Sequence, residues 1–246
     1  MKANKTKKCT RCKTHKRLDD FGKQQGGKYG KKGYCKKCNQ EEIKQYQRKR
    51  QERIKLLPNT LTEEQAEEIK KDFNYACALT GKDENVQLDH FIPILWGESL
   101  NKYEIGGTTW ANMIPINRSL NSSKGAMNPF IWIERYHQRH NIDLIKWQEA
   151  VQYVASKYNM TAQEFKKNID LCYNEYLIMR WINDINEEVE KENGRKGLLM
   201  KQALRMGINI DLVVRLHGNE KAQDFIQQLN EENRLKEMKA SLLKFG

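Results

Sequence analysis

The sequence predicts an α+β protein in three parts: a small cysteine-rich N-terminal module, a core that contains β-strands, and a mainly α-helical C-terminal region. Four of the six cysteines form two C-x2-C pairs within residues 1–40. Two short apolar stretches, 86–90 and 113–116, have the length of strands and follow turn signals or polar loops. From Asn128 onward, apolar residues recur at helical spacing.

Positive charge is concentrated at the N-terminus. The chain of 246 residues has a formal net charge of +12. Residues 1–55 contain 20 Lys and Arg against 5 Asp and Glu, a net of +15, so the remainder carries −3. A concentrated basic segment attracts polyanions, and phosphate contacts supply most of the binding free energy of such segments. The charge therefore predicts a nucleic-acid partner.

No apolar stretch of the sequence approaches the roughly 20 residues that span a bilayer. The basic start, MKANKTKKC, is not followed by the apolar segment of a secretory signal. We therefore expect a cytoplasmic protein without a membrane partner. Thiols stay reduced in that compartment.

The paired cysteines have the spacing of a metal site, C-x2-C-x22-C-x2-C, with Cys9, Cys12, Cys35 and Cys38 as ligands. Two such pairs complete the tetrahedral thiolate set that Zn²⁺ prefers. The glycine-rich segment between them is too polar to build a core, so it needs a metal to fold. Disulfides or redox pairs are the alternative, which the doubled motif and a reducing compartment disfavour. Four thiolates leave no position for water, so the predicted zinc is structural.

This zinc module would display basic side chains to DNA or RNA. We expect the contacts from Lys7, Lys8, Arg11, Lys13, Lys36 and Lys37. Residues 41–58 follow as a basic helix and linker that ends at Pro58.

Local signals predict the ends of several other helices. Thr62-Glu-Glu-Gln65 and Thr161-Ala-Gln-Glu164 are capping-box patterns, and Asn128-Pro129 is a cap followed by proline at the first helical position. Around Gly207, two short helical patterns resemble a helix-turn-helix loosely, and an ordinary helical hairpin is the alternative.

Asp89 and His90 stand together at the end of the first predicted strand. Neighbours on a strand point to opposite faces, so the two side chains serve different purposes. An imidazole is suited to act as a general base near neutral pH, and a carboxylate oxygen is a ligand for Mg²⁺. Polar residues follow downstream in the order Asn112, Asn117, Asn121 and Lys124.

Three pieces in this order, LDHFIPI, WANMIPIN and LNSSKG, resemble the HNH family of nucleases, whose core is the ββα-metal fold. The resemblance covers about Cys77 to Asn128. With its cysteine-rich start, the chain is similar to HNH proteins of phages and mobile elements, such as homing endonucleases, which work in a bacterial host cell. The implied domains are a zinc-ribbon-like module at 1–40, a linker at 41–58, an HNH core at 59–128, and helices at 129–246 that could read DNA.

The resemblance also implies roles for individual residues. His90 is the expected general base, Asp89 and Asn121 the ligands of a catalytic Mg²⁺ or Mn²⁺, and Asn112 the residue that holds the general-base loop. Asn117 competes with either asparagine and ranks third. The family's last residue is often histidine, and the oxygen-only pair favours Mg²⁺ or Mn²⁺ over Zn²⁺ at this site.

Two other features follow from the resemblance. Lys124 is expected to contact a phosphate, and Arg118 is a weaker candidate for the same role. Many family members brace the core with a zinc held by two C-x2-C pairs, of which Cys77 alone remains here. We therefore expect packing, including the helices after Asn128, to brace the core instead.

Together, these patterns predict a metal-dependent DNA endonuclease, monomer or homodimer, that nicks double-stranded DNA with one site per chain. The alternative is a non-catalytic, zinc-dependent nucleic-acid-binding protein. An enzyme acting on RNA or on branched DNA is a third interpretation, because a basic segment does not distinguish these substrates.

Overall fold

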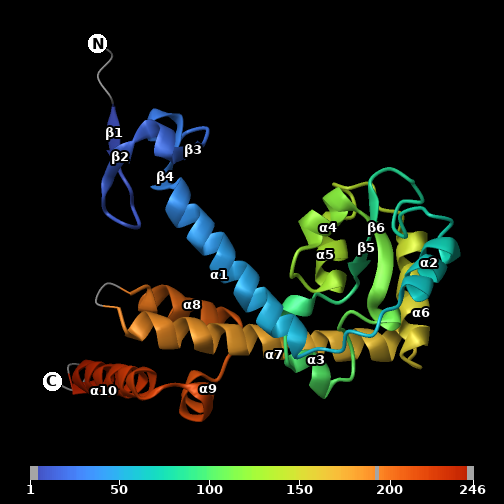
Figure 1. Ribbon diagram of the computed structural model, residues 1–246. Coiled ribbons are helices and arrows are strands. Elements are labelled where there is room, and N and C mark those ends of the chain that lie inside the picture. Colours follow the sequence, from blue (N-terminus) through green and yellow to red (C-terminus); the bar gives the residue numbers. More distant parts are fainter. Residues whose placement is uncertain (1–4, 192–193, 243–246) are drawn as a thin grey trace.

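The computed structural model describes residues 5–191 and 194–242, without the side chains of residues 49, 53 and 234–242. The chain mixes helices with small sheets, and the sheets of the described residues are three antiparallel pairs of strands (Figure 1). The strands are β1 (Thr6–Lys8), β2 (His15–Arg17), β3 (Phe21–Lys23), β4 (Lys31–Cys35), β5 (Val86–His90) and β6 (Met113–Asn117). The α-helices are α1 (Lys36–Lys55), α2 (Glu63–Asp72), α3 (Ser99–Lys102), α4 (Arg118–Lys124), α5 (Pro129–Tyr136), α6 (Leu144–Lys157), α7 (Ala162–Val189), α8 (Lys196–Arg205), α9 (Ile210–His217) and α10 (Glu220–Leu242).

The N-terminal module consists of two hairpins, β1–β2 and β3–β4, followed by the start of α1. The first cysteine pair lies in the turn between β1 and β2, whereas Cys35 ends β4 and Cys38 lies in the first turn of α1. The second pair thus lies at a strand-to-helix junction. In a zinc ribbon, it would lie on a second hairpin turn. The helix begins at Lys36, five residues before the segment predicted to be helical.

Helix α1 joins this module to the rest of the molecule (Figure 1). Its exposed first half projects from the module, and its last turn packs on the central core through Ile54. Leu57, just beyond the helix, is buried in the same core. The basic segment predicted as helix and linker is therefore mostly one helix, anchored at both ends.

The central core is built around the β5–β6 hairpin. The register pairs Asp89 with Ile114 and His90 with Met113, and α4 follows β6 directly and packs on the hairpin. The predicted strand 86–90 is confirmed residue for residue. Helices α5, α6 and the first half of α7 pack around it, with Trp132, Val154, Phe165 and Ile169 among the fully buried side chains.

The predicted helix starts are confirmed by their hydrogen bonds. Thr62 and Thr161 each form a reciprocal capping box, with Gln65 and Glu164 respectively. The Asn128 side chain accepts a hydrogen bond from the N–H of Phe130 at the start of α5. Such caps satisfy N–H groups that have no partner within the helix.

The helical region after residue 128 divides between two cores. The first half of α7 belongs to the central core, and its second half forms a separate core with α8, α9 and α10 around Trp181 and Ile185. The boundary predicted at residue 128 lies within the central core, to which α5 and α6 also contribute. Helices α8 and α9 are joined by a short turn in which Gly207 has a φ of +66°.

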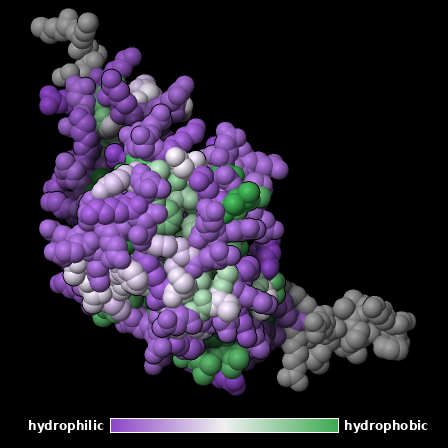
Figure 2. Space-filling model, turned by 90° about the vertical axis from the view of Figure 1, so that its right-hand side faces the viewer, coloured by the Kyte–Doolittle hydropathy of each residue, from purple (hydrophilic) through white to green (hydrophobic). Residues whose placement is uncertain are grey.

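Hydrophilic side chains dominate the face of the molecule seen in Figure 2, and hydrophobic ones are confined to small areas. Among the described residues, every helix is too short or too polar to serve as a transmembrane span.

Candidate functional site

The four paired cysteines converge on one point. The Sγ atoms of Cys9, Cys12, Cys35 and Cys38 all lie within 4.8 Å of one another, and those of Cys9 and Cys38 are 3.9 Å apart. Four Zn–S bonds of about 2.3 Å in a tetrahedron place the sulfurs about 3.8 Å apart. The cluster could therefore hold a structural metal such as zinc, as the spacing predicts.

The protein backbone favours the thiolate form of Cys9. Burial acts against ionisation, but N–H groups of Cys35, Arg11 and Cys12 donate to its sulfur, and the net effect lowers the pKa of Cys9 to about 6. Burial and the neighbouring thiols raise the pKa of Cys38 to about 12. Thiolates this close repel one another unless a cation lies between them.

Two of the predicted nucleic-acid contacts have partners within the module. The ammonium of Lys7 donates to the carbonyls of Lys31 at 3.0 Å and Lys32 at 2.9 Å, which ties β1 to β4. Arg11 pairs with Glu42 and lies over the ring of Tyr34. The other four predicted contacts are exposed, at Lys8, Lys13, Lys36 and Lys37.

Asp89 and His90 turn toward different elements of the core. Nε2 of His90 lies 2.9 Å from the hydroxyl of Thr108, in the loop before β6. Oδ2 of Asp89 lies 2.9 Å from the ammonium of Lys124 on α4. Their opposite directions on β5 thus give the two neighbours separate surroundings, as expected for a strand.

Lys124 does not lie where a phosphate contact was predicted. Its side chain is 6% exposed, and besides Asp89 its ammonium donates to the carbonyl of His90 at 2.5 Å. Burial lowers the pKa of Lys124, and the attraction of Asp89 opposes this. A buried ammonium needs such partners, because an isolated buried charge is costly. In this structure Lys124 fixes the end of β5 from within.

The His90 ring is largely buried, and burial favours its neutral form. Burial lowers the pKa of His90 to about 4, because the protein interior solvates an imidazolium poorly. The charge of Asp89 raises this pKa, and the charges of Lys124 and Arg50 lower it. The imidazole is therefore neutral at pH 7, which is the form that can accept a proton.

Asn112 braces the loop that follows His90. Its Oδ1 accepts from the N–H of Ile92 at 2.8 Å, and its Nδ2 donates to the carbonyls of Ile92 at 3.1 Å and Gly107 at 2.8 Å. The side chain is fully buried, and its own carbonyl accepts from the N–H of Phe91. Through these bonds Asn112 holds the loop that follows His90 in place.

We expect Asn112→Ala to destabilise the fold by about 2–4 kcal/mol, because it leaves buried groups of Ile92 and Gly107 without partners. The matched control is Asn117→Ala, which removes a helix cap worth about 1 kcal/mol. Urea denaturation followed by tryptophan fluorescence measures both. Equal losses in the two variants would contradict the bracing role of Asn112.

The remaining predicted residues lie on or beside α4. Asn117 caps this helix by accepting from the N–H of Ser119 at 2.8 Å, and it donates to the carbonyl of Glu84 at 2.7 Å. Its side chain is thus engaged in local structure. Arg118 is exposed at the first helical position.

Asn121 is half-buried on α4, three residues before Lys124. Residues three apart share a helix face. Because Lys124 contacts Asp89, Asn121 lies on the side of α4 that faces β5. A carboxylate oxygen and an amide oxygen are suitable donors for Mg²⁺. The donor types of Asp89 and Asn121 therefore fit a hard cation, although one oxygen of Asp89 already pairs with Lys124.

Sequence reasoning missed Thr108, the hydrogen-bond partner of His90. This residue also ties in the segment after α1: its N–H donates to the carbonyl of Pro58 at 2.8 Å, and its carbonyl accepts from the N–H groups of Thr60 and Leu61. The only local signal is the preceding Gly106-Gly107, whose positive φ values of +87° and +73° mark an unusual backbone path. No sequence pattern predicts the hydrogen bond between Thr108 and His90.

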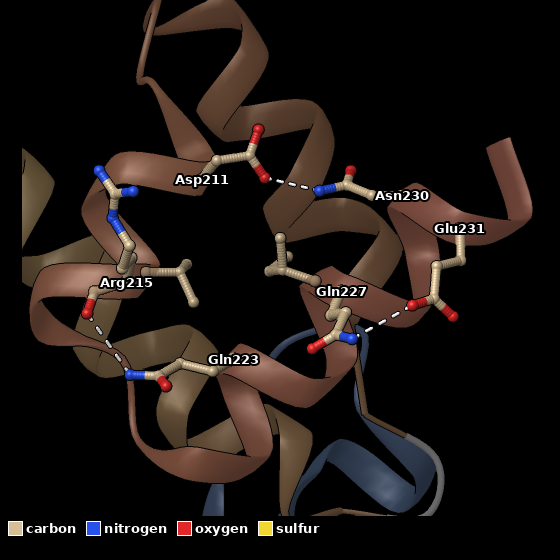
Figure 3. A pocket seen from close by; sticks show the side chains of 8 residues that line it. Asp211, Arg215, Gln223, Gln227, Asn230 and Glu231 are labelled. Carbon is tan, nitrogen blue, oxygen red and sulfur yellow. Dashed lines mark hydrogen bonds between the residues drawn. The ribbon is translucent and has the colours of Figure 1, made fainter. Parts of the chain in front are cut away.

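A hollow between α9 and α10 lies apart from these residues (Figure 3). Its polar side chains are engaged with one another or with the backbone: Asn230 donates to Asp211, Gln227 to Glu231, and Gln223 to the carbonyl of Arg215. The residues that line the hollow include no cysteine, histidine or serine, and they form no metal-ligand cluster. Comparison with known protein families, curated proteins and solved structures gives no match for this chain.

Proposed function

We propose that the protein is a metal-dependent DNA endonuclease of the HNH type with a ββα-metal core formed by β5, β6 and α4. The observation that carries this proposal is the arrangement at the end of β5. A neutral imidazole, His90, and a carboxylate, Asp89, point to different sides of β5. The side chain of Asn112 holds the loop that follows His90.

In this proposal, His90 removes a proton from the water that attacks the phosphorus. Thr108 keeps the ring in place through Nε2, so the other nitrogen is the one available to the water. Asp89 and Asn121 would hold a Mg²⁺ or Mn²⁺ ion, which supplies positive charge for the leaving oxygen when bound. One such site cuts one phosphodiester, so a single chain nicks.

The zinc module and α1 would hold the duplex. The module exposes Lys8, Lys13, Lys36 and Lys37, and α1 continues the positive charge toward the core. Phosphate contacts of this kind bind DNA without regard to sequence. The C-terminal helices α8 to α10 are the part of the chain that could add sequence recognition.

A binding protein without activity is the second candidate, and one observation favours it. The ammonium of Lys124 already neutralises Asp89, so the carboxylate has a cation partner before any metal binds. An ion pair between Lys124 and Asp89 is the arrangement expected of a protein that keeps the HNH residues but no longer binds the catalytic metal.

The test is a nicking assay on supercoiled plasmids of unrelated sequence and on a four-way junction. The protein is loaded with Zn²⁺, freed of other divalent ions, and assayed without addition and with Mg²⁺ or Mn²⁺. We expect open circles only when Mg²⁺ or Mn²⁺ is present. Retardation of duplex DNA in a gel without any cleavage of these substrates would reject the nuclease and favour the binding protein.

A further inference from the structure

The end of α6 holds the segment before β6 on both sides of Thr108. Two residues before Thr108, the N–H of Gly106 donates to the hydroxyl of Tyr158 at 2.9 Å. Two residues after it, the carbonyl of Trp110 accepts from the ammonium of Lys157 at 3.4 Å. Lys157 is the last residue of α6 and Tyr158 follows it directly. These two neighbours form the α6 clamp, which encloses the segment that carries Thr108.

The ammonium of Lys157 is held among aromatic rings. Its Nζ lies 3.9 Å from the centroid of the Trp110 ring and 3.8 Å from that of Tyr153, distances at which a cation is attracted to a ring face. It also donates to the hydroxyl of Tyr153 at 2.6 Å, and that hydroxyl donates to Asp72 at the end of α2 at 2.6 Å. Burial lowers the pKa of Lys157 to about 8, and the charges of Asp72 and Glu68 oppose this. The ammonium thus has a fixed place, unlike that of a solvated lysine.

Tyr158 is fixed by packing. Its ring stacks on the fully buried ring of Phe165, with 5.6 Å between the centroids. Burial raises the pKa of Tyr158 to about 12, so its hydroxyl is neutral. The backbone that it binds is also closely packed: Gly106 has a φ of +87°, and a Cβ at this position would lie 2.9 Å from a methyl group of Leu100. Both partners of this hydrogen bond therefore belong to the packed central core.

The clamped segment leads to both side chains that fix the surroundings of His90. Thr108 lies 2.9 Å from Nε2 of the ring. Asn112 ends the short 3-10 turn that begins with Trp110, and it holds the loop after His90. A general base has to lie within hydrogen-bond reach of the proton that it removes, and a small displacement lowers the rate. A shift of this segment would move both supports of the ring.

We propose that Lys157 and Tyr158 are positioning residues of the candidate active site. By holding the segment 106–110, they keep Thr108, and through it the ring of His90, in the orientation that activates water. This inference rests on the proposed nuclease function. It gives α6, which is expected from the sequence only to brace the core, a part in the reaction. Because misplacement by about 1 Å can cost 10²-fold, we expect each residue to contribute about 10- to 10²-fold in rate.

The first experiment compares variants that remove one polar group each. Tyr158→Phe removes the hydroxyl and keeps the ring, Lys157→Met removes the charge and keeps an apolar stem, and Lys157→Arg restores a cation. The matched control is Tyr103→Phe, which removes a hydroxyl bound to Glu175 elsewhere in the same core. In single-turnover nicking at saturating protein, we expect Tyr158→Phe and Lys157→Met to be about 10- to 10²-fold slower, with duplex affinity unchanged. Lys157→Arg should recover most of the rate, and Tyr103→Phe should match the wild type.

The second measurement reads the ring directly and does not depend on cleavage. The ¹⁵N spectrum of the imidazole shows which ring nitrogen carries the proton, and the signals of His90 are identified by their loss in His90→Ala. We expect a single tautomer in the zinc-loaded wild type and in Tyr103→Phe. In Tyr158→Phe and Lys157→Met, the same signals should move toward the values of a ring that exchanges between both tautomers. A purely structural role would lower the melting temperature without this change.

Three results would overturn the proposal. If the wild type nicks and both variants match it in rate and in the His90 spectrum, the nuclease function stands and the α6 clamp has no part in it. If the variants are slow but their His90 spectrum is that of the wild type, the two residues act on something other than the ring. A wild type that binds duplex but never nicks removes the nuclease function and the positioning role together. Thermal unfolding identifies any variant that fails to fold, and Tyr158→Phe carries the test if Lys157→Met does.

Discussion

Replacement of His90 by alanine is expected to lower the nicking rate by about 10²- to 10⁴-fold and to leave duplex binding unchanged. The imidazole is the one neutral base at the end of β5, and loss of a general base typically costs this much. DNA binding is expected to persist because the exposed lysines of the N-terminal module and α1 are untouched. Single-turnover nicking and gel retardation on the same protein sample measure the two effects.

The matched control for this variant is His217→Ala, which removes an exposed histidine at the end of α9. It should nick at the wild-type rate. If His90→Ala nicked as fast as His217→Ala, the general base would have to be another group. If His90→Ala lost binding as well, the ring would be needed for the fold of the β5 end, where it contacts Thr108.

Removal of the metal from the cysteine cluster is expected to unfold the N-terminal module and leave the central core folded. The buried core of the module consists of three of the four cysteines and Phe21, with Tyr34 packed against them. So little apolar burial cannot offset the conformational entropy of some 30 ordered residues. In such modules the free energy of metal binding, about 10–16 kcal/mol for zinc-finger peptides, is the free energy of folding.

The measurement is the amide NMR spectrum before and after a strong chelator, together with metal content per chain. Peaks of the module should collapse to unfolded positions, and those of the β5–β6 core should stay. Cys35→Ser should have the same effect as the chelator. Cys77→Ser, which alters a buried thiol of the central core, should keep one metal per chain. A module that stays folded without metal would reject the structural role of the ion.

Local signals in the sequence predicted the parts of the fold that depend on few neighbouring residues. The capping boxes at Thr62 and Thr161 and the Asn128-Pro129 start are present, because each depends on contacts a few residues apart. The strand at 86–90 is present as well, although its partner strand β6 lies much later in the chain. The cysteine cluster was predictable for a related reason, because the C-x2-C spacing brings both thiols of a pair to the same side of a tight turn.

The sequence could not predict contacts that form only when distant elements meet. Lys124 resembled a phosphate ligand one turn after Asn121, yet α4 packs so closely on β5 that its ammonium is enclosed. Thr108 reaches His90 from a loop 18 residues later in the chain, and no sequence pattern indicates this contact. The start of α1 within the second cysteine pair was missed because lysines and a metal-ligand pattern carry no helix-start signal.

The continuity of α1 has a geometric consequence for any substrate that touches both ends of it. The helix has 20 residues, which gives a length of about 30 Å. One turn of B-form DNA is about 34–36 Å, or 10–10.5 base pairs. A duplex lying along α1 would therefore show nearly the same side of its helix to the N-terminal module and to the central core. Because α1 is one unbroken helix, it would fix both the spacing and the rotational phase of such a duplex between these two parts of the protein.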